Sequence, residues 1–503
     1  MASPAHPAPS AHRRFPLSGR ELKLLLTFWI IYLYFMNPLG TVMSNAALGE
    51  TVSLVERHSF EINPQDAIDL SIYEGKVYSG IAPGTTFFAA PMYYITRPLY
   101  AHIPDFVNKN DIGAVMGFRT PDDVAYLQLF CSVFLVAFGS ALMVMFFYRL
   151  LHDFSRNENY ILMATITLGV GSLLFYYASA YYHQTLGAIF LFFCFYLLYR
   201  VKQRRLGSAY LAPAGLLAGL APFTDYAQAT VAFILFLYLL TFRRDASVLA
   251  FCLGAALPLG AIGLLDYIQF DNPLHTPYKY RWHQELAGHG YGFMGLTHPR
   301  WVTVYALSFH PIKGIFLYMP FVFLSLFGVF LKLRSQWRWE VLACLAIGVA
   351  YFFHNASLTT YTSWTSGQGF FGSRYFVVVA PFMAIPLVFA LERVWYWFGL
   401  LICSASVFIN YLGAQYGIYP FDWNTLSDRS VYPNKNPLWW IFKEFIDKGP
   451  GTPLFDTYVG RPPESLANNL AGLALLGVVI LLVWNADRLV PRALRAAPAA
   501  APG

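Results

Sequence analysis

Charged residues are scarce in this chain of 503 residues, in which Asp, Glu, Lys and Arg together make up 12%. Soluble domains average about 25%, so the shortage excludes an ordinary soluble globular protein. The sequence instead has long apolar runs, and about 20 apolar residues in a helix cross the hydrocarbon core of a bilayer. The predicted fold class is therefore all-α, a polytopic transmembrane helical protein with about twelve spans (eleven to thirteen). The spans are predicted at residues 22–43, 124–148, 159–179, 183–200, 207–222, 225–242, 247–270, 312–331, 339–355, 375–391, 395–417 and 467–486.

Cysteine is also rare. The five Cys residues all fall inside predicted spans, so the sequence predicts neither a disulfide framework nor an exposed reactive thiol. No CxxC or HExxH pattern and no P-loop occurs. These absences argue against the common zinc sites and against a cytoplasmic nucleotide site, for which the predicted cytoplasmic loops are also too short.

The distribution of Lys and Arg predicts the orientation of the spans. Short loops rich in basic residues stay in the cytoplasm, and 19 of the 34 Lys and Arg residues fall on one set of alternate, very short segments. Both termini are then cytoplasmic, and the long loops 44–123, 271–311, 356–374 and 418–466 are extracytoplasmic. The net charge of +7 is explained by this topology, so no nucleic-acid partner is predicted.

The domain organisation follows from these boundaries. It comprises a disordered cytoplasmic tail (1–20), a transmembrane core (21–418) that includes loop 44–123, an extracytoplasmic loop (419–466), a last transmembrane helix (467–486) and a cytoplasmic tail (487–503). The Ala/Pro-rich composition of both ends favours disorder there.

The loop 44–123 is the longest, and it follows the first span directly. Its segment 47–58 (ALGETVSLVERH) predicts a helix along the membrane interface, and the apolar stretch 87–95 (FFAAPMYYI) is expected to lie on the membrane surface. The other long loops are rich in Trp, Tyr, His and Pro. Aromatic residues are enriched at membrane interfaces, and aromatic faces beside polar groups also suit sugars. The large acidic loop after the first span therefore predicts chemistry at the boundary between water and lipid.

Three segments resemble a known family. They are 68–91 (IDLSIYEGKVYSGIAPGTTFFAAP), with Asp69, Gly75, Tyr78, Ser79, Pro83, Gly84 and Pro91, then 308–328 (SFHPIKGIFLYMPFVFLSLFG), and 364–375 (WTSGQGFFGSRY). Together they resemble bacterial polytopic glycosyltransferases of the GT-C superfamily, relatives of the protein O-mannosyltransferases. The resemblance runs from about residue 25 to residue 395. The chain departs from the pattern at Ile81, where the family often carries Lys before the Ala-Pro-Gly triplet, and Lys76 is the nearest basic residue that could compensate.

This resemblance implies an enzyme of the bacterial cytoplasmic membrane. Such enzymes transfer a sugar from a polyprenyl-phosphate carrier to an extracytoplasmic acceptor, which is a glycan, a lipid or a protein. The acceptor hydroxyl needs a carboxylate to take its proton, and the leaving phosphate needs hydrogen-bond donors or cations where charge develops. No cofactor is predicted, and no metal ion is required if Arg and Lys hold the phosphate, although a divalent metal would be compatible with the chemistry.

The general base is expected among the carboxylates of the first loop, where the resemblance places a catalytic acid. Glu50 and Glu56 follow the first span most closely, and Asp69 matches the family motif. A solvated loop charge is the alternative interpretation for each of them.

Arg374 is the first candidate for the phosphate, because it follows a Gly-rich turn and Arg binds phosphate oxygens in a bidentate way. A side chain reaching to the interface is the alternative. Asp225, at the break between two spans, suits either a binding site or a helix N-cap. The remaining substrate-binding candidates are Lys76, Tyr78, His183, Lys279, Arg281, Lys313 and Trp364.

Two functions without glycosyl transfer stay open. A secondary transporter would also have about twelve spans, but charged sites near the midplane are expected in that class, whereas ionisable residues here gather at one membrane face. A flippase for lipid-linked sugars would share the lipid groove and the outer loops, and only a carboxylate placed to act as a base would distinguish the enzyme from it.

Overall fold

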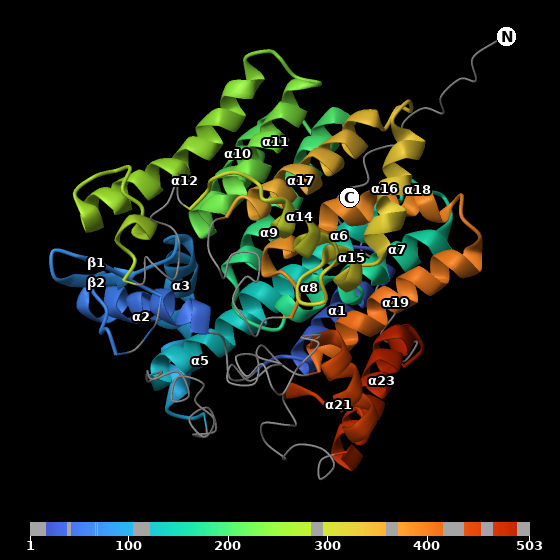
Figure 1. The fold of residues 1–503 in the computed structure, drawn as a ribbon, viewed down its shortest axis with the longest axis horizontal. Helices are drawn as coiled ribbons and strands as arrows, with labels where there is room; N and C mark the ends of the chain where they lie inside the picture. Colours follow the sequence, from blue (N-terminus) through green and yellow to red (C-terminus); the bar gives the residue numbers. More distant parts are fainter. Residues whose placement is uncertain are drawn as a thin grey trace, which may run out of the picture.

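The computed structural model of the protein describes residues 17–37, 42–65, 67, 69–103, 121–282, 295–358, 371–415, 437–453 and 466–489, and almost all of its regular structure is helical (Figure 1). The helices of the bundle are α1 (Gly19–Tyr34), α5 (Asp122–Cys131), α6 (Phe138–Leu151), α7 (Glu158–Val170), α8 (Leu173–Tyr177), α9 (His183–Lys202), α10 (Leu211–Thr224), α11 (Ala229–Leu240), α12 (Ser247–Phe270), α14 (Trp301–Phe309), α15 (Ile315–Tyr318), α16 (Phe321–Lys332), α17 (Arg338–Ala356), α18 (Ala380–Leu391), α19 (Tyr396–Ala414), α21 (Pro437–Lys448) and α23 (Leu466–Leu489).

The predicted class, a polytopic helical membrane protein, is confirmed. Six helices of the described residues are long and apolar enough to cross a membrane, at Asp122–Leu151, His183–Lys202, Ser247–Phe270, Arg338–Ala356, Tyr396–Ala414 and Leu466–Ala486. Each of the other predicted spans overlaps a shorter helix. Local sequence explains one of these interruptions, because α7 ends at Gly171 and the Ser172 side chain caps the new helix α8.

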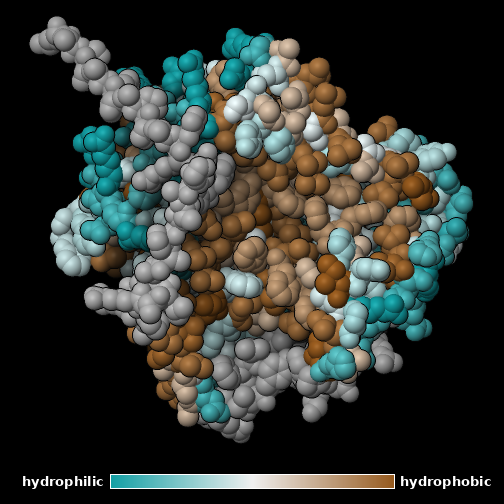
Figure 2. Space-filling model, turned by 180° about the vertical axis from the view of Figure 1, so that it is seen from behind, coloured by the Kyte–Doolittle hydropathy of each residue, from teal (hydrophilic) through white to brown (hydrophobic). Residues whose placement is uncertain are grey.

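The surface agrees with a membrane setting. Figure 2 shows a broad hydrophobic face across the molecule, with hydrophilic residues gathered on either side of it. Exposed apolar side chains on α12, such as Leu253, Leu257 and Leu264, would be unfavourable in water. A lipid environment removes that cost, since hydrocarbon tails are as apolar as these side chains.

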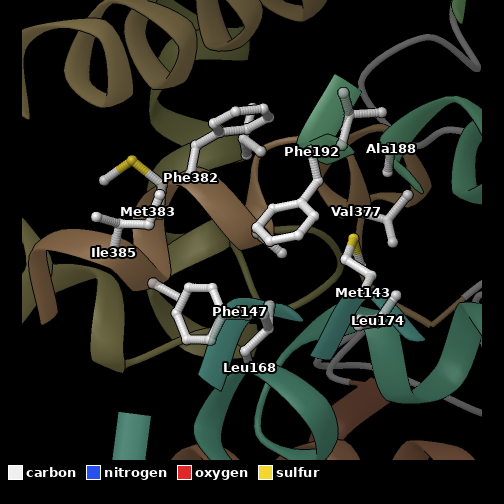
Figure 3. Close-up of a cluster of buried hydrophobic side chains, with 14 of the residues drawn as sticks. Met143, Phe147, Leu168, Leu174, Ala188, Phe192, Val377, Phe382, Met383 and Ile385 are labelled. Atoms are coloured by element: carbon white, nitrogen blue, oxygen red, sulfur yellow. The ribbon is translucent and has the colours of Figure 1, made fainter. Parts of the chain in front are cut away.

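The core is a continuous apolar cluster at the centre of the bundle. Side chains from α6, α8, α9 and α18 meet there, including Met143, Leu174, Phe192 and Phe382 (Figure 3). Helix α18 is buried along its whole length. Helix α10 packs unusually close to α12, because a Cβ atom added at Gly215 would lie 1.9 Å from the Phe251 carbonyl oxygen. Small residues permit such close backbone contact between membrane helices.

The first loop forms a small subdomain at one end of α12 (Figure 1). It contains α2 (Val42–Arg57), the antiparallel strands β1 (Leu70–Tyr73) and β2 (Lys76–Ser79), and α3 (Gly84–Tyr100). The helix predicted at 47–58 is therefore present as part of α2, and its position along the membrane interface stays a prediction. The stretch 87–95 is helical too, and its Tyr94 and Ile95 are among the most exposed apolar side chains of the loop. The hairpin was not predicted.

Candidate active site

The hairpin of the first loop is joined by a distant segment of the chain. The segment after α12 contains a short 3-10 helix, η5 (Pro277–Tyr280), and it runs along β1. The Ser71 hydroxyl donates to the Pro277 carbonyl at 2.7 Å, and the Trp282 amide donates to the Leu70 carbonyl at 3.0 Å. Backbone pairing of Ser71 with Arg281 extends the sheet edge. The residues that precede β1 and those that follow η5 are thereby placed side by side.

This pairing brings Asp69 to Arg281. The Arg281 guanidinium donates to the Asp69 carboxylate at 3.2 Å. The side chains are 20% and 13% exposed, so a substrate can still reach the carboxylate. The guanidinium also lies over the Tyr278 ring, 5.1 Å from its centroid. Two of the predicted site residues therefore form one ion pair.

Two further predicted cations lie beside this pair. Arg374 begins the 3-10 helix η6 (Arg374–Val377), directly after Gly372 and Ser373, and Gly372 has a φ of +61°. Arg374 is buried and lies within electrostatic range of Asp69. Lys313 is buried as well, donates to the Gly372 carbonyl at 2.7 Å, and lies within electrostatic range of Arg374. Arg281 and Arg374 thus bring positive charge to one place, and the buried Lys313 amine adds a hydrogen-bond donor, so an anionic group would be stabilised there.

Asp225 and His183 complete the cluster. Asp225 separates α10 from the 3-10 helix η4 (Tyr226–Gln228), and one carboxylate oxygen accepts from the Ala227 amide at 3.2 Å. The predicted cap is therefore present, while the Gln228 side chain lies close to the same carboxylate. Both Asp225 and His183, the first residue of α9, are buried within electrostatic range of Arg374. The structure groups six predicted residues here: Asp69, His183, Asp225, Arg281, Lys313 and Arg374.

The Ala-Pro-Gly triplet of the first loop holds this subdomain against the bundle. Gly84 begins α3, and a Cβ atom added there would lie 2.5 Å from the Phe223 carbonyl oxygen near the end of α10. Only glycine allows this close approach. The contact is made with Phe223, two residues before Asp225. Ile81 is buried, so the position where the family often carries Lys has a packing role in this chain.

The other two candidate bases have partners of their own. The Glu50 carboxylate accepts from the Thr86 hydroxyl at 2.8 Å, from the Gln269 amide at 3.3 Å and from the Ser79 amide at 3.5 Å. Burial raises its pKa to about 7, against the lowering effect of these hydrogen bonds. Glu50 thus connects α2, α3, β2 and α12.

Glu56 lies at the last turn of α2 and forms an ion pair with Arg97 at 2.8 Å. It also accepts from the Tyr93 hydroxyl at 3.1 Å. Neither partner belongs to the cluster around Arg374.

The remaining predicted residues lie outside this cluster. Lys76, near the tip of the hairpin, is exposed and paired with Glu61 at 3.3 Å, so the structure gives no support to a compensating role for Ile81. Tyr78 faces the Phe270 ring, with centroids 5.6 Å apart. Lys279 is exposed and lies 2.7 Å from a His275 ring nitrogen. Trp364 falls outside the described residues.

Four tyrosines of the site were missed from the sequence. Tyr226, Tyr278, Tyr351 and Tyr375 lie among the charged residues, with the Tyr226 and Tyr278 ring centroids 5.3 Å apart and the Arg374 guanidinium 5.3 Å from the Tyr375 centroid. Tyrosine is so common in this chain that no pattern distinguishes them.

Asp266 was also missed. It is a buried carboxylate within a predicted span, and an ionisable residue at such a position indicates a functional site. No group of three or more His, Cys, Asp or Glu residues suited to a metal ion occurs among the described parts of the chain.

Comparison with known proteins shows the fold and little more. No family model matches the sequence, and no curated protein matches it either. Among solved structures, ArnT from Cupriavidus metallidurans, bound to undecaprenyl phosphate, is similar over 92% of this chain and 75% of its own, with a TM-score of 0.50 and 15% identity.

Two structures of the Archaeoglobus fulgidus oligosaccharyltransferase AglB, one apo and one with an inhibitory peptide and a dolichol-phosphate, are similar to 82% and 83% of this chain. Their TM-scores are 0.42 and 0.39, at 14% and 15% identity, and the chain spans 58% of their length. At 15% identity, the similarity to ArnT concerns the fold alone. The relationships to the GT-C superfamily and to the protein O-mannosyltransferases stay predictions.

Proposed function

We propose that the protein transfers a sugar from a polyprenyl-phosphate carrier to an acceptor hydroxyl, with Asp69 as the general base. The observation that carries this proposal is the position of Asp69. Asp69 is the partly exposed carboxylate of the site, paired with Arg281 and within electrostatic range of Arg374, whereas the other carboxylate of the site, Asp225, is buried. The solved ArnT structure that shares the fold holds undecaprenyl phosphate, which agrees with a carrier of this class.

The cations fit a leaving phosphate. As the bond between the anomeric carbon and the phosphate oxygen breaks, negative charge develops on that oxygen, and preplaced donors stabilise it without reorganisation. Arg374 and Lys313 are held in place by burial, and Lys313 is fixed by its bond to Gly372. Because the Arg374 guanidinium lies away from bulk water, its attraction for the phosphate is strong, and the Lys313 amine can donate a hydrogen bond to the same group.

Asp69 then activates the acceptor. Its carboxylate takes the hydroxyl proton while the acceptor oxygen forms the new bond to the anomeric carbon, and the carrier phosphate departs with the electron pair of the broken bond. Arg281 positions the carboxylate through the bond at 3.2 Å. Alignment of acceptor and donor in one site contributes further, because it replaces a bimolecular encounter.

An apolar cavity of the bundle offers a place for a lipid tail. Its volume is about 210 Å³, and Ile315, Phe316, Phe352, Val379 and Met383 are among its lining residues. Ile315 follows Lys313 by two residues, and Val379 follows Arg374 by five. We place the head of the carrier at the cations and its first isoprene units in this cavity. The protein is then an enzyme of the cytoplasmic membrane with the first loop outside and both termini inside.

A transfer assay tests the proposal. Purified protein receives a panel of radiolabelled polyprenyl-phosphate sugars, with native membrane extract as the source of acceptors. Asp69→Asn, Glu50→Gln and Glu56→Gln are assayed beside the wild type. We expect label to move to a new product, and Asp69→Asn alone to prevent this. Binding of donor without transfer by the wild type, with donor moving across the membrane of proteoliposomes, would identify a flippase instead. A protein that binds no carrier would support a transporter.

A further inference from the structure

Several buried polar atoms near Arg374 have no hydrogen-bond partner among the described residues. They are the Nδ1 atom of His183, the second carboxylate oxygen of Asp225, the hydroxyls of Tyr226 and Tyr351, and the Nε atom of Arg281. More than about 90% of buried polar groups in proteins are paired, and each one left unpaired costs roughly 1–3 kcal/mol. Five such atoms around one site indicate that a ligand completes their bonding.

The residues that carry these atoms lie around Arg374. Tyr351 lies within electrostatic range of Asp225 and Arg374, and His183 lies within range of Arg374 and Arg281. They come from α9, from the break between α10 and α11, from α17, and from Arg281, which pairs with Asp69. A ligand at these atoms would therefore lie near both Arg374 and the pair of Arg281 and Asp69.

The chemistry of these groups fits a sugar ring. A carboxylate oxygen accepts, an Arg Nε donates, and Tyr hydroxyls and a His ring nitrogen can do either. Sugar hydroxyls both donate and accept, so they match a mixed set of this kind. From this arrangement we infer that Asp225, His183, Tyr226 and Tyr351 bind the sugar of the carrier and select for it. This inference rests on the proposed function and deepens it.

The surrounding charge favours a neutral or amino sugar over an acidic one. One of the unpaired atoms is a carboxylate oxygen of the buried Asp225. The carboxylate of a uronic acid placed against it would be repelled, because like charges repel strongly where water is excluded. A hydroxyl or an ammonium group would instead donate to it.

A binding comparison with and without the sugar tests this inference. The probes are undecaprenyl phosphate and its glucosyl, mannosyl and galacturonosyl derivatives, each titrated into the full-length protein in detergent. We expect Tyr351→Phe, Tyr226→Phe and Asp225→Asn to bind bare undecaprenyl phosphate within about twofold of the wild type. For each variant, the ratio of the affinity for a neutral sugar derivative to the affinity for the bare carrier should decrease by about fivefold or more. The galacturonosyl derivative should be disfavoured by the wild type.

Thermal unfolding of the ligand-free variants separates this role from a structural one. Loss of a hydroxyl that is buried and unpaired should leave the melting temperature of Tyr351→Phe and Tyr226→Phe unchanged or higher, and a structural hydroxyl would lower it. Tyr160→Phe, at the other end of the bundle on α7, is the matched control. It should change neither the affinity for bare undecaprenyl phosphate nor the affinity for its sugar derivatives.

The possible failures are distinguishable. An unchanged affinity ratio in all three variants would overturn the sugar site, and so would a wild type that binds no sugar derivative better than the bare carrier. A wild type that does not bind the bare carrier would overturn the proposed function itself.

Discussion

The Arg281 guanidinium donates to the Asp69 carboxylate at 3.2 Å across 212 positions of the sequence. The contact joins the first loop to the segment that follows α12. A backbone hydrogen bond from Trp282 to Leu70 and a bond from the Ser71 hydroxyl to the Pro277 carbonyl hold it in register. The pair is largely removed from water, so the cost of desolvation offsets much of its Coulomb energy and its net contribution to the fold is small. Its importance is positional, because it fixes the direction of the carboxylate proposed as the base.

Asp69→Asn is expected to reduce the transfer rate by roughly 10²–10⁴-fold, the usual contribution of a general base. The amide keeps the size of the side chain, so folded yield and donor affinity should persist. Asp271→Asn is the matched control. Asp271 is exposed with a φ of +55° at the end of α12, a conformation that Asn tolerates well. Retention of more than about a tenth of the activity in Asp69→Asn would assign the base to another group.

Arg374→Ala is expected to lower kcat by roughly 10²–10³-fold, the effect of removing a donor from a site of developing charge. Arg374→Lys should recover part of this loss, because it keeps the charge without the planar fork. Radiometric transfer assays measure both. Arg97→Ala serves as control, since Arg97 is exposed and, among the described residues, forms its ion pair with Glu56. A loss of activity in Arg97→Ala equal to that in Arg374→Ala would move the site towards Glu56.

The pKa of Glu50, raised from 4.5 to about 7 by burial, predicts a dependence of stability on pH. Between these values the folded protein binds more protons than the unfolded one, so stability decreases as the pH rises through this window. At about 1.4 kcal/mol per pH unit the total is on the order of 3 kcal/mol. Glu50→Gln keeps an acceptor for Thr86 and removes the titration. Melting curves from pH 4.5 to 8 should therefore converge at low pH, with the variant more stable at high pH. Parallel curves would refute the assignment.

Gly84→Ala is expected to destabilise the protein by about 1–3 kcal/mol, because the added Cβ overpacks against the Phe223 carbonyl at 2.5 Å. Transfer should decrease as well, since the first loop would move relative to Asp225. Gly49→Ala is the matched control on α2. Its Cβ would meet only Ile62 at 4.0 Å, and Ala favours a helix by up to about 1 kcal/mol over Gly. Equal melting temperatures for the two variants would contradict the close packing.

Local patterns were sufficient for the class and for many of the elements. Apolar runs located helices within all the predicted spans, but they overestimated the length of several, because breaks such as the one at Ser172 depend on caps. The hairpin could have been predicted. Its strands, LSIY and KVYS, flank Glu74 and Gly75, which both have positive φ, and a two-residue turn with Gly between β-rich segments is a strong hairpin signal.

The contacts of the site were beyond a single sequence. Lys76 and Lys313 are both cations near predicted loops, yet only Lys313 is buried beside Arg374. Burial of that kind depends on which loops meet, and hydrophobic periodicity reports only the face that each helix buries. The same reason explains why Asp69 could not be paired with Arg281 from the sequence, and why Glu56, which lies closer to the first span, could not be excluded as the base.

The separation of Asp69 from Arg281 also has a consequence for biosynthesis. Ribosomes add about 5–20 residues per second, so about 10–40 s pass between synthesis of the carboxylate and synthesis of its partner, 212 residues later. During that time the helices from α5 to α12 enter the membrane, while the edge of β1 lacks the segment that later covers it. A nascent chain arrested before residue 277 would carry the first loop without the strand partner that orders it, and its hairpin would be the natural target for a chaperone at the membrane surface.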